Sequence, residues 1–403
     1  MKYLSPSAPI WGQAFRPMFL LGALFSAFAI AIWGTGIAAM GAGNPIAWLP
    51  QYGEVSGHFW HSHEMLFGFA AAIVAGFLLT AVQNWSGQRA INGKALLVVT
   101  LVWLAGRVFM LLGGLVPWWL IAAVDLAFLP MVAWYFFKPL YAVKQKRNYF
   151  FSVVMLLMTA MNAVMHWGNH TNDLGIIYWG GHSMSLMVVL LITVIGGRVM
   201  PMFTANGSGT PRVMNLEWLE KSVLGSTWLF VMLFITTLHT LLPAWLMGLL
   251  CLVTAVLQAI RIIRLRISVT WKVPLLWSLH LAYWFISIGF VLMALYYFGV
   301  LSSFSTALHA LTVGAIGGMI IAMIARVSLG HSGRPLQPKK VMSVSFILVL
   351  VAALVRSVAI FLLPSLTLQF YWVSAILWAI AFVIFVLAYF NILTTLRPDG
   401  RPG

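Results

Sequence analysis

The sequence is poor in charge, in acidic residues and in cysteine. Charged residues make up 7% of the 403 residues, whereas soluble domains use about 25%. This composition excludes a soluble globular protein. The single cysteine, Cys251, excludes disulfides and thiolate metal sites. Hydrophobic residues make up 62% of the chain, so we predict an integral membrane protein of the all-α class.

Long apolar runs occupy almost all of the sequence. A membrane-spanning helix needs about 20 mostly apolar residues, and twelve such runs follow one another with short connections. We therefore predict one polytopic domain over residues 1–403, with no soluble domain between the spans. The predicted spans are Phe15–Met40, His58–Trp85, Lys94–Leu112, Trp118–Phe137, Tyr149–Trp167, Leu174–Phe203, Asn215–Thr240, Ala244–Arg264, Pro274–Val300, Phe304–Leu329, Val341–Leu363 and Thr367–Leu396.

The scarcity of acids leaves a formal net charge of +16, which taken alone would suggest nucleic acid as a partner. The positions of the basic residues exclude that interpretation, because they gather in every second loop. This alternation is the positive-inside pattern, and it predicts that both termini are cytoplasmic. The basic residues of these loops include Arg89, Lys94, Lys144, Lys146, Arg147, Arg264, Arg266, Lys339, Lys340 and Arg397.

Two arginines, Arg107 and Arg356, lie inside predicted spans and away from the basic loops. A charge at the centre of a spanning helix costs about 2.5–3.5 kcal/mol on insertion scales. One interpretation is that each side chain extends to the outer membrane surface. The other is that each faces an anionic group inside the helix bundle, and Asp125 could serve one of them.

Histidines are concentrated toward one side of the predicted membrane. Three of them fall in the stretch GHFWHSHEMLFGF, residues 57–69, and of the ten in the chain all but His280 and His331 lie in the predicted periplasmic half. A random distribution would divide them nearly evenly, so the clustering predicts a site. For a lone membrane histidine such as His239, an interhelical hydrogen bond is the alternative.

Imidazoles at that depth suit heme iron and copper, because neutral imidazole is a good ligand for both metals. A heme between helices needs axial histidines, small residues beside the macrocycle and cations for its two propionates. His63 and His309 are the candidate axial ligands, and Arg107 and Arg356 are the candidate propionate partners. Gly314, Gly317 and Gly318 follow His309. We predict that these small residues leave room for the macrocycle beside the helix, below His309.

The spacing within the second span separates its histidines. His58, His61 and Glu64 are three residues apart and are predicted to share one helix face. His63 is two residues from His61, which places it about 160° around the helix at ~100° per residue. His63 could therefore face a heme, while the other three line a second site or its entrance.

A weak internal repetition accompanies these histidines. The second, sixth and tenth spans each carry one near the predicted periplasmic start, as His182 and His309 show for the last two. The spans are four apart, which suggests three four-helix pseudo-repeats.

Five stretches together resemble the NnrS family: HSHEMLFGF, GFLLTAVQNWSG, GGRVMPMFTANG, HALTVGAIGGM and RVSLGHSGRPL. The resemblance runs from Gly12 to at least Arg334. It implies a twelve-helix protein of the bacterial inner membrane that contains heme b and copper. It also implies a role in the response to nitric oxide during nitrosative stress and denitrification, with nitric oxide as the ligand. The electron donor is not identified.

The second span is also similar, more distantly, to the second helix of heme–copper oxidase catalytic subunits. In that superfamily helices 2 and 10 carry the axial histidines of a low-spin heme, which by resemblance points to His63 and His309. The adjacent histidine pair of the oxidases is missing here, as is their HPEVY-type segment. A copper ion would therefore need another set, such as His182 with His58, His61 or His239.

Three functions remain open from the sequence. The first is a heme protein that binds nitric oxide or passes electrons. The second is a nitric oxide reductase, which needs two metals about 4 Å apart and a proton route, although Glu64 and Asp125 are the only acids in the second to fifth spans. The third is a transporter, for which the stretch IGGRVMP, Ile195–Pro201, is a candidate break in the sixth span.

Overall fold

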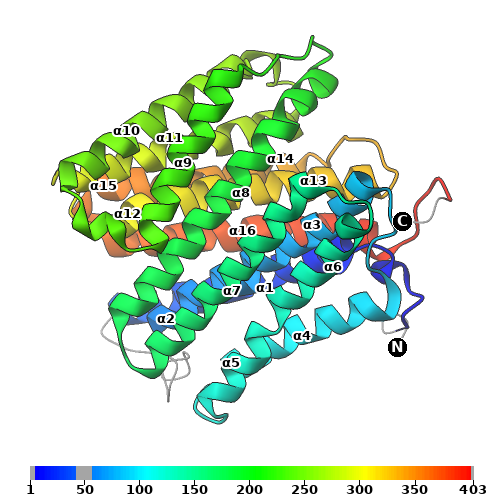
Figure 1. Cartoon of the computed structure of the whole chain (residues 1–403), viewed down its shortest axis with the longest axis horizontal. Helices are drawn as coiled ribbons and strands as arrows, with labels where there is room; N and C mark the ends of the chain where they lie inside the picture. Colours follow the sequence, from blue (N-terminus) through cyan, green and yellow to red (C-terminus); the bar gives the residue numbers. More distant parts are fainter. Residues whose placement is uncertain (1–4, 42–56, 401–403) are drawn as a thin grey trace. The chain divides into compact units, whose positions relative to one another are not determined.

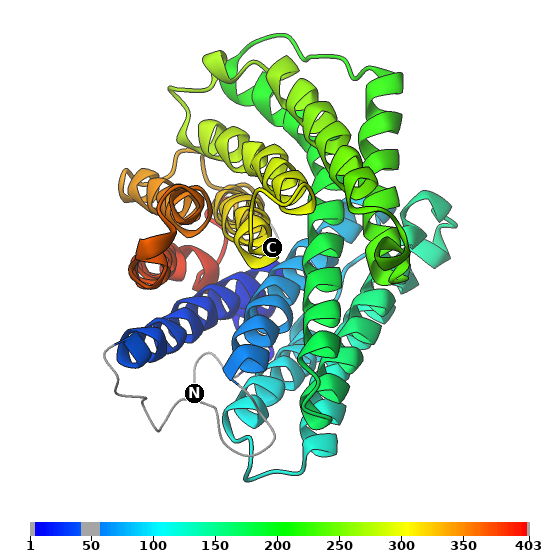
Figure 2. The ribbon, with the colours of Figure 1, turned by 90° about the vertical axis from the view of Figure 1, so that its left-hand side faces the viewer.

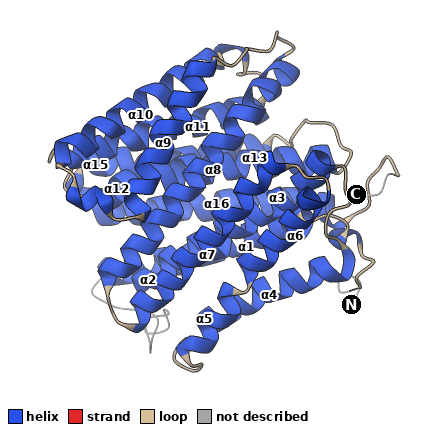
Figure 3. Cartoon of the chain, viewed as in Figure 1, coloured by secondary structure: helices blue, strands red, loops and turns tan. Residues whose placement is uncertain are grey.

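The structure, a computed structural model, describes residues 5–41 and 57–400, and these fold as helices and short connections (Figure 3). Twelve helical stretches of the described chain are long and apolar enough to cross a membrane. This confirms the predicted all-α fold with twelve spans. The loop between the first and second spans lies outside the described residues. The predicted cytoplasmic placement of both termini stays a prediction.

The predicted and observed starts of the spans coincide at many positions, including Phe15, Trp118, Leu174, Ala244 and Phe304. Three spans are interrupted by π-helical segments, which are Glu64–Ala70, Ala310–Gly317 and Val355–Ala359. The α-helices are α1 (Phe15–Gly41), α2 (Gly57–His63), α3 (Ala71–Ser86), α4 (Gly93–Leu111), α5 (Trp118–Leu126), α6 (Phe128–Ala142), α7 (Tyr149–His170), α8 (Leu174–Ser208), α9 (Glu217–Ile235), α10 (Ala244–Arg264), α11 (Pro274–Tyr297), α12 (Phe304–His309), α13 (Gly318–His331), α14 (Val341–Leu354), α15 (Ile360–Leu362) and α16 (Thr367–Thr394).

The predicted break in the sixth span is wrong. Helix α8 continues through Pro201 to Ser208. A proline has no backbone N–H, so the carbonyl four residues earlier, that of Gly197, loses its helical partner. The side-chain amide of Asn215 donates a hydrogen bond to this carbonyl at 3.3 Å. The replacement bond satisfies the exposed acceptor and lets the helix continue.

The chain divides into two compact units, each built from separate segments. Unit 1 comprises residues 1–184, 324–336 and 382–403, and unit 2 comprises residues 185–323 and 337–381. Helices α8, α13 and α16 each contribute to both. The organisation of residues 1–403 as a single domain stays a prediction.

Unit 1 is organised around the second span. Helix α1 lies beside α3 and the π-helical segment that precedes it (Figures 1 and 2), α3 packs against α6, and α6 packs against α7. Arg16 of α1 is fully buried and donates hydrogen bonds to the carbonyls of Leu393 and Thr395, at 3.2 and 2.7 Å. These carbonyls end α16, where helical acceptors lack partners and carry partial negative charge. Arg16 therefore caps that helix.

In unit 2, α11 packs against α10 and against the π-helical segment after His309 (Figure 1). The predicted role of the glycines in this segment is wrong. The rings of Phe285 and Trp378 occupy the space that a Cβ would take at Gly314 and Gly317, and a Cβ at Gly318 would lie 2.7 Å from that of Ala282. These glycines allow close packing within the unit, and their surface is already covered by protein.

Candidate functional site

The candidate site of unit 1 forms where the second span changes its helical geometry. Helix α2 ends at His63, and the next seven residues, Glu64–Ala70, are π-helical. π-Helical segments are rare and occur frequently at functional sites. Here His63 and Glu64 are both buried, and His63 Nδ1 lies 3.0 Å from Glu64 Oε1. Two consecutive titratable residues thus contact each other inside the unit.

Arg107 joins two carboxylates from two other spans. Its Nη1 donates to Glu64 Oε1 at 2.7 Å, and its Nη2 donates to Asp125 Oδ1. The side chain of Arg107 is 3% exposed, which excludes the interpretation that it extends to the membrane surface. The prediction that Asp125 could serve one of the two intramembrane arginines is confirmed for Arg107.

Asp125 is also the centre of a second set of contacts, with its other oxygen. Oδ2 lies 3.0 Å from His63 Nε2 and 3.1 Å from His166 Nε2, and it accepts a hydrogen bond of 2.6 Å from Asn162. Asn162 and His166 are four residues apart on α7, so they share one face of that helix. One carboxylate therefore links α5, the second span and α7.

The arrangement has the chemistry of a metal site. The ligand atoms of His63, Asp125 and His166 all lie within 4.8 Å of one another. Two imidazoles with one carboxylate form a donor set that suits copper or non-heme iron. Both ring nitrogens of His63 face carboxylate oxygens, which only accept hydrogen bonds, so without a metal both nitrogens carry hydrogens and His63 is charged. Arg107 and this imidazolium together compensate the two carboxylates, whose charge is costly to bury in a membrane. A bound cation would take the place of the proton at His63 Nε2.

His58 and His61 contact a different neighbour from His63, as the spacing of the histidines in the second span predicts. His61 stacks on Trp33 of α1 at 4.5 Å between ring centroids, and His58 approaches the same ring at 6.0 Å. Glu64 does not join them, which corrects the predicted shared face. The α-helical spacing rule fails at this point because the segment that starts at Glu64 is π-helical.

The four predicted copper ligands are not members of this cluster. His182 stacks on Tyr178 in unit 1, with ring centroids 5.7 Å apart, and His239 stacks on Phe234 in unit 2 at 4.1 Å. Among the described residues, neither of them nor His58 or His61 belongs to the group with metal-binding geometry. A copper site built from these four histidines stays a prediction.

The four predicted heme residues form two pairs. His63 and Arg107 belong to the cluster in unit 1, where both contact Glu64 and Asp125. In unit 2, His309 Nε2 lies 3.3 Å from Arg356 Nη2. Binding of one heme by all four residues stays a prediction. Both ring nitrogens of His63 already have protein partners, which are Glu64 at Nδ1, and Asp125 together with Asn162 Oδ1, at 2.8 Å, at Nε2. An iron ligated by His63 would have to displace one of these sets of contacts.

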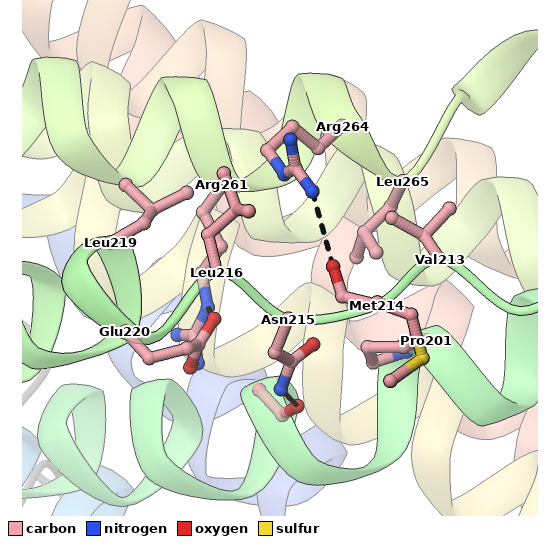
Figure 4. Close-up of a pocket in the computed structure, with 11 residues that line it drawn as sticks. Pro201, Val213, Met214, Asn215, Leu216, Leu219, Glu220, Arg261, Arg264 and Leu265 are labelled. Carbon is pink, nitrogen blue, oxygen red and sulfur yellow. Dashed lines mark hydrogen bonds and ion pairs between the residues drawn. The ribbon is translucent and has the colours of Figure 1, made fainter.

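A second buried polar cluster lies in unit 2, beside a cavity of about 20 Å³ that Glu220 and Arg261 line (Figure 4). A cavity of this size holds about one water. Arg261 donates to both carboxylate oxygens of Glu220, to the Tyr283 hydroxyl at 2.8 Å and to the Thr193 carbonyl at 2.9 Å. These contacts satisfy the charge internally, so the cluster holds α9, α10 and α11 together.

Sequence reasoning missed His166 and Asn162 as site residues, and it assigned Asp125 only as a partner for arginine. The signal was present in MNAVMHW, where an amide and an imidazole are four residues apart in an apolar span. Periodicity does not reveal which neighbouring helix that face meets, so the pairing with Asp125 required the structure.

Replacement of Arg107 by alanine would leave Glu64 and Asp125 as unpaired buried carboxylates. We expect the free energy of unfolding to fall by about 3–5 kcal/mol, the usual cost of breaking a buried ion pair. Thermal unfolding of the detergent-solubilised protein, followed by circular dichroism, measures this loss. Arg89→Ala, at an exposed loop arginine, is the matched control. Equal melting temperatures for the two variants would contradict the structural role of Arg107.

Gly68→Ala tests the packing of the ion-pair cluster. An added Cβ would lie 2.8 Å from Arg107 Nη1 and 2.9 Å from Glu64 Oε2, so the pair must shift. We expect a lower melting temperature, because overpacking of this kind reduces the free energy of unfolding by about 1–3 kcal/mol. Gly225→Ala in α9 is the control, because a Cβ there meets no atom within 4 Å. Gly225→Ala should be neutral or slightly stabilising, and a similar result for Gly68→Ala would sink the prediction.

Comparisons with known proteins place this site in a family. A family model described as NnrS protein matches residues 9–397, which includes both polar clusters. A search of curated proteins found no match. The family match covers nearly the whole chain and agrees with the twelve apolar spans. The chain therefore belongs to the NnrS family, and this membership supports a multi-pass membrane protein of the nitric oxide response.

Proposed function

We propose that this protein binds a redox-active metal at His63, Asp125 and His166, and that it binds nitric oxide there as part of the bacterial response to nitrosative stress. The bacterial inner membrane is the proposed location. The observation that carries the proposal is the convergence of two imidazoles and one carboxylate, from three spans, within 4.8 Å. Family membership supplies the link to nitric oxide.

The donor set fits copper, the metal that family membership implies. Neutral imidazole binds copper well, and the carboxylate adds a negative charge that favours a cation. The surrounding polar groups fit as well, because Glu64 Oε2 is buried without a hydrogen-bond partner among the described residues. A copper ion, when bound, supplies one-electron chemistry and an open position for a diatomic ligand.

The residues around the donor set orient it. Arg107 holds Asp125 Oδ1, and the Asn162 amide donates to Asp125 Oδ2, so the carboxylate is fixed on both oxygens. Glu64 contacts His63 Nδ1, which leaves Nε2 directed toward Asp125 and His166. Contacts of this kind around metal ligands fix the tautomer and raise the basicity of an imidazole. Burial of all these residues excludes bulk water from the site.

Heme b with His63 and His309 as axial ligands is the second candidate. The contact between His309 and Arg356 favours a cofactor that carries carboxylates near His309. Heme iron and the metal of the three-residue cluster would compete for His63, because each of these sites uses that imidazole as a ligand.

The remaining functions receive less support. A nitric oxide reductase needs a second metal about 4 Å from the first, and the described residues provide one group of three metal-binding side chains. A transporter loses one of its supporting features, the candidate break in the sixth span, since α8 is continuous through Pro201.

Metal analysis and optical spectroscopy of the purified full chain test the proposal. We expect about one metal ion per chain in the wild type, and a largely metal-depleted protein for His166→Ala and for Asp125→Asn. His170→Ala is the matched control, because His170 ends the same helix and is exposed. Addition of nitric oxide to the reduced protein should change the absorption or electron paramagnetic resonance spectrum of the wild type and of the control only.

Two outcomes would contradict the proposal. Unchanged metal content in His166→Ala and Asp125→Asn would exclude the cluster as the metal site. A Soret band that is lost in His63→Ala and retained in His166→Ala would assign His63 to heme and favour the second candidate.

A further inference from the structure

The arginines inside the spans have different partners. Arg107 pairs with two carboxylates and Arg261 with one. Arg16 donates to the carbonyls at the end of α16, which carry partial negative charge. Arg356, which is partly exposed, has no carboxylate partner among the described residues. A guanidinium at membrane depth is costly unless an anion compensates its charge, so Arg356 differs from Arg107 and Arg261 in its electrostatics.

The guanidinium of Arg356 contacts groups that carry no negative charge. Its Cζ lies 3.9 Å from the centroid of the Tyr371 ring, and its Nη2 lies 3.3 Å from His309 Nε2. Its Nη1 is shielded from solvent and has no hydrogen-bond partner within residues 5–41 and 57–400. The Nη2 side of the guanidinium is therefore held by His309, whereas Nη1 is a solvent-shielded donor for which the described residues provide no acceptor.

The imidazole of His309 does not supply the missing charge. Its Nδ1 lies 2.6 Å from the carbonyl oxygen of Ser305. A carbonyl oxygen only accepts, so Nδ1 carries the hydrogen. A guanidinium only donates, so Nε2 accepts from Arg356 and carries none. His309 is thus neutral in this arrangement.

Unit 2 contains no acid that is free to pair with Arg356. Its two acidic residues are Glu217 and Glu220. Glu217 pairs with Lys221 at 2.7 Å, and Glu220 pairs with Arg261. Arg356 also lies in a π-helical segment, Val355–Ala359, a geometry found frequently at functional sites.

We propose that Arg356, with Tyr371 and His309 beside it, is a binding site for a monovalent anion of the oxyanion or carboxylate class. The anion contacts Nη1, the edge without an acceptor, while His309 and Tyr371 hold the guanidinium in place. None of these residues belongs to the metal cluster of unit 1. A small inorganic oxyanion and the carboxylate of a bound organic cofactor share this chemistry.

Thermal unfolding of the full chain in detergent tests the site, with sodium nitrite or sodium acetate as the probe. Sodium chloride, whose anion is neither an oxyanion nor a carboxylate, keeps the ionic strength constant. We expect a saturable rise in the melting temperature of the wild type with at least one probe, because a ligand that binds only the folded state stabilises it. The rise should be absent in Arg356→Gln and retained, with weaker apparent affinity, in Arg356→Lys.

The melting temperatures measured without nitrite or acetate distinguish Arg356 from an arginine whose charge is compensated by carboxylates. Arg356→Gln in sodium chloride alone should melt no lower than the wild type, because it removes an uncompensated charge. Arg107→Gln should melt well below the wild type, because it strands two carboxylates. An anion response that persists in Arg356→Gln would overturn the proposal, and so would the absence of a response from every wild-type sample.

The same samples identify the source of the anion. Their Soret absorbance reports the fraction that carries heme. A response confined to heme-free protein would assign the native anion to a carboxylate of the cofactor. A response in heme-bearing and heme-free protein alike would assign it to a small inorganic oxyanion.

Discussion

A charge buried in a membrane must find a partner of opposite sign, and the Arg107 interaction with Glu64 and Asp125 is the clearest response to that constraint in this protein. The three residues come from three different spans, so the ion pairs specify which helix faces meet inside unit 1. Lipid tails are as apolar as the side chains they touch, so hydrophobicity alone does not select helix partners in a membrane. Polar contacts therefore carry much of the specificity here.

The same cluster joins structure to proposed function. Asp125 gives one oxygen to Arg107 and the other to His63, His166 and Asn162. A residue that helps to hold the spans together is thus also the central ligand of the candidate metal centre. Unit 2 uses a similar polar cluster, around Arg261, in which every charge is satisfied. The two clusters differ in that only the first gathers imidazoles.

The sequence was sufficient for the spans because hydropathy and length are local properties. Because few acids are available in the membrane, the sequence was also sufficient to propose Asp125 as a partner for one of the two intramembrane arginines, and the structure shows that this arginine is Arg107. The sequence placed His309 and Arg356 at one predicted site, and they are in contact within unit 2. It could not reveal the turn of Glu64 toward Arg107, because the π-helical segment leaves no clear mark in composition. Nor could it show that the glycines after His309 accommodate Phe285 and Trp378, because small residues equally suit a cofactor or a neighbouring side chain.

The π-helical segment Glu64–Ala70 also constrains the length of the second span. A π turn accommodates about one residue more than an α turn, so removal of one residue between positions 64 and 70 would restore a continuous α-helix. The helix would remain apolar and long enough to cross the bilayer. Because the π segment takes up the additional residue, the helices on either side would keep nearly the same relative orientation after this deletion. If the segment instead became α-helical without a deletion, the two halves would rotate by about 100° relative to each other, and His63 would no longer face Asp125 while α3 kept its packing. The π-helical geometry, and not the length of the span, therefore keeps His63 on the face that meets Asp125.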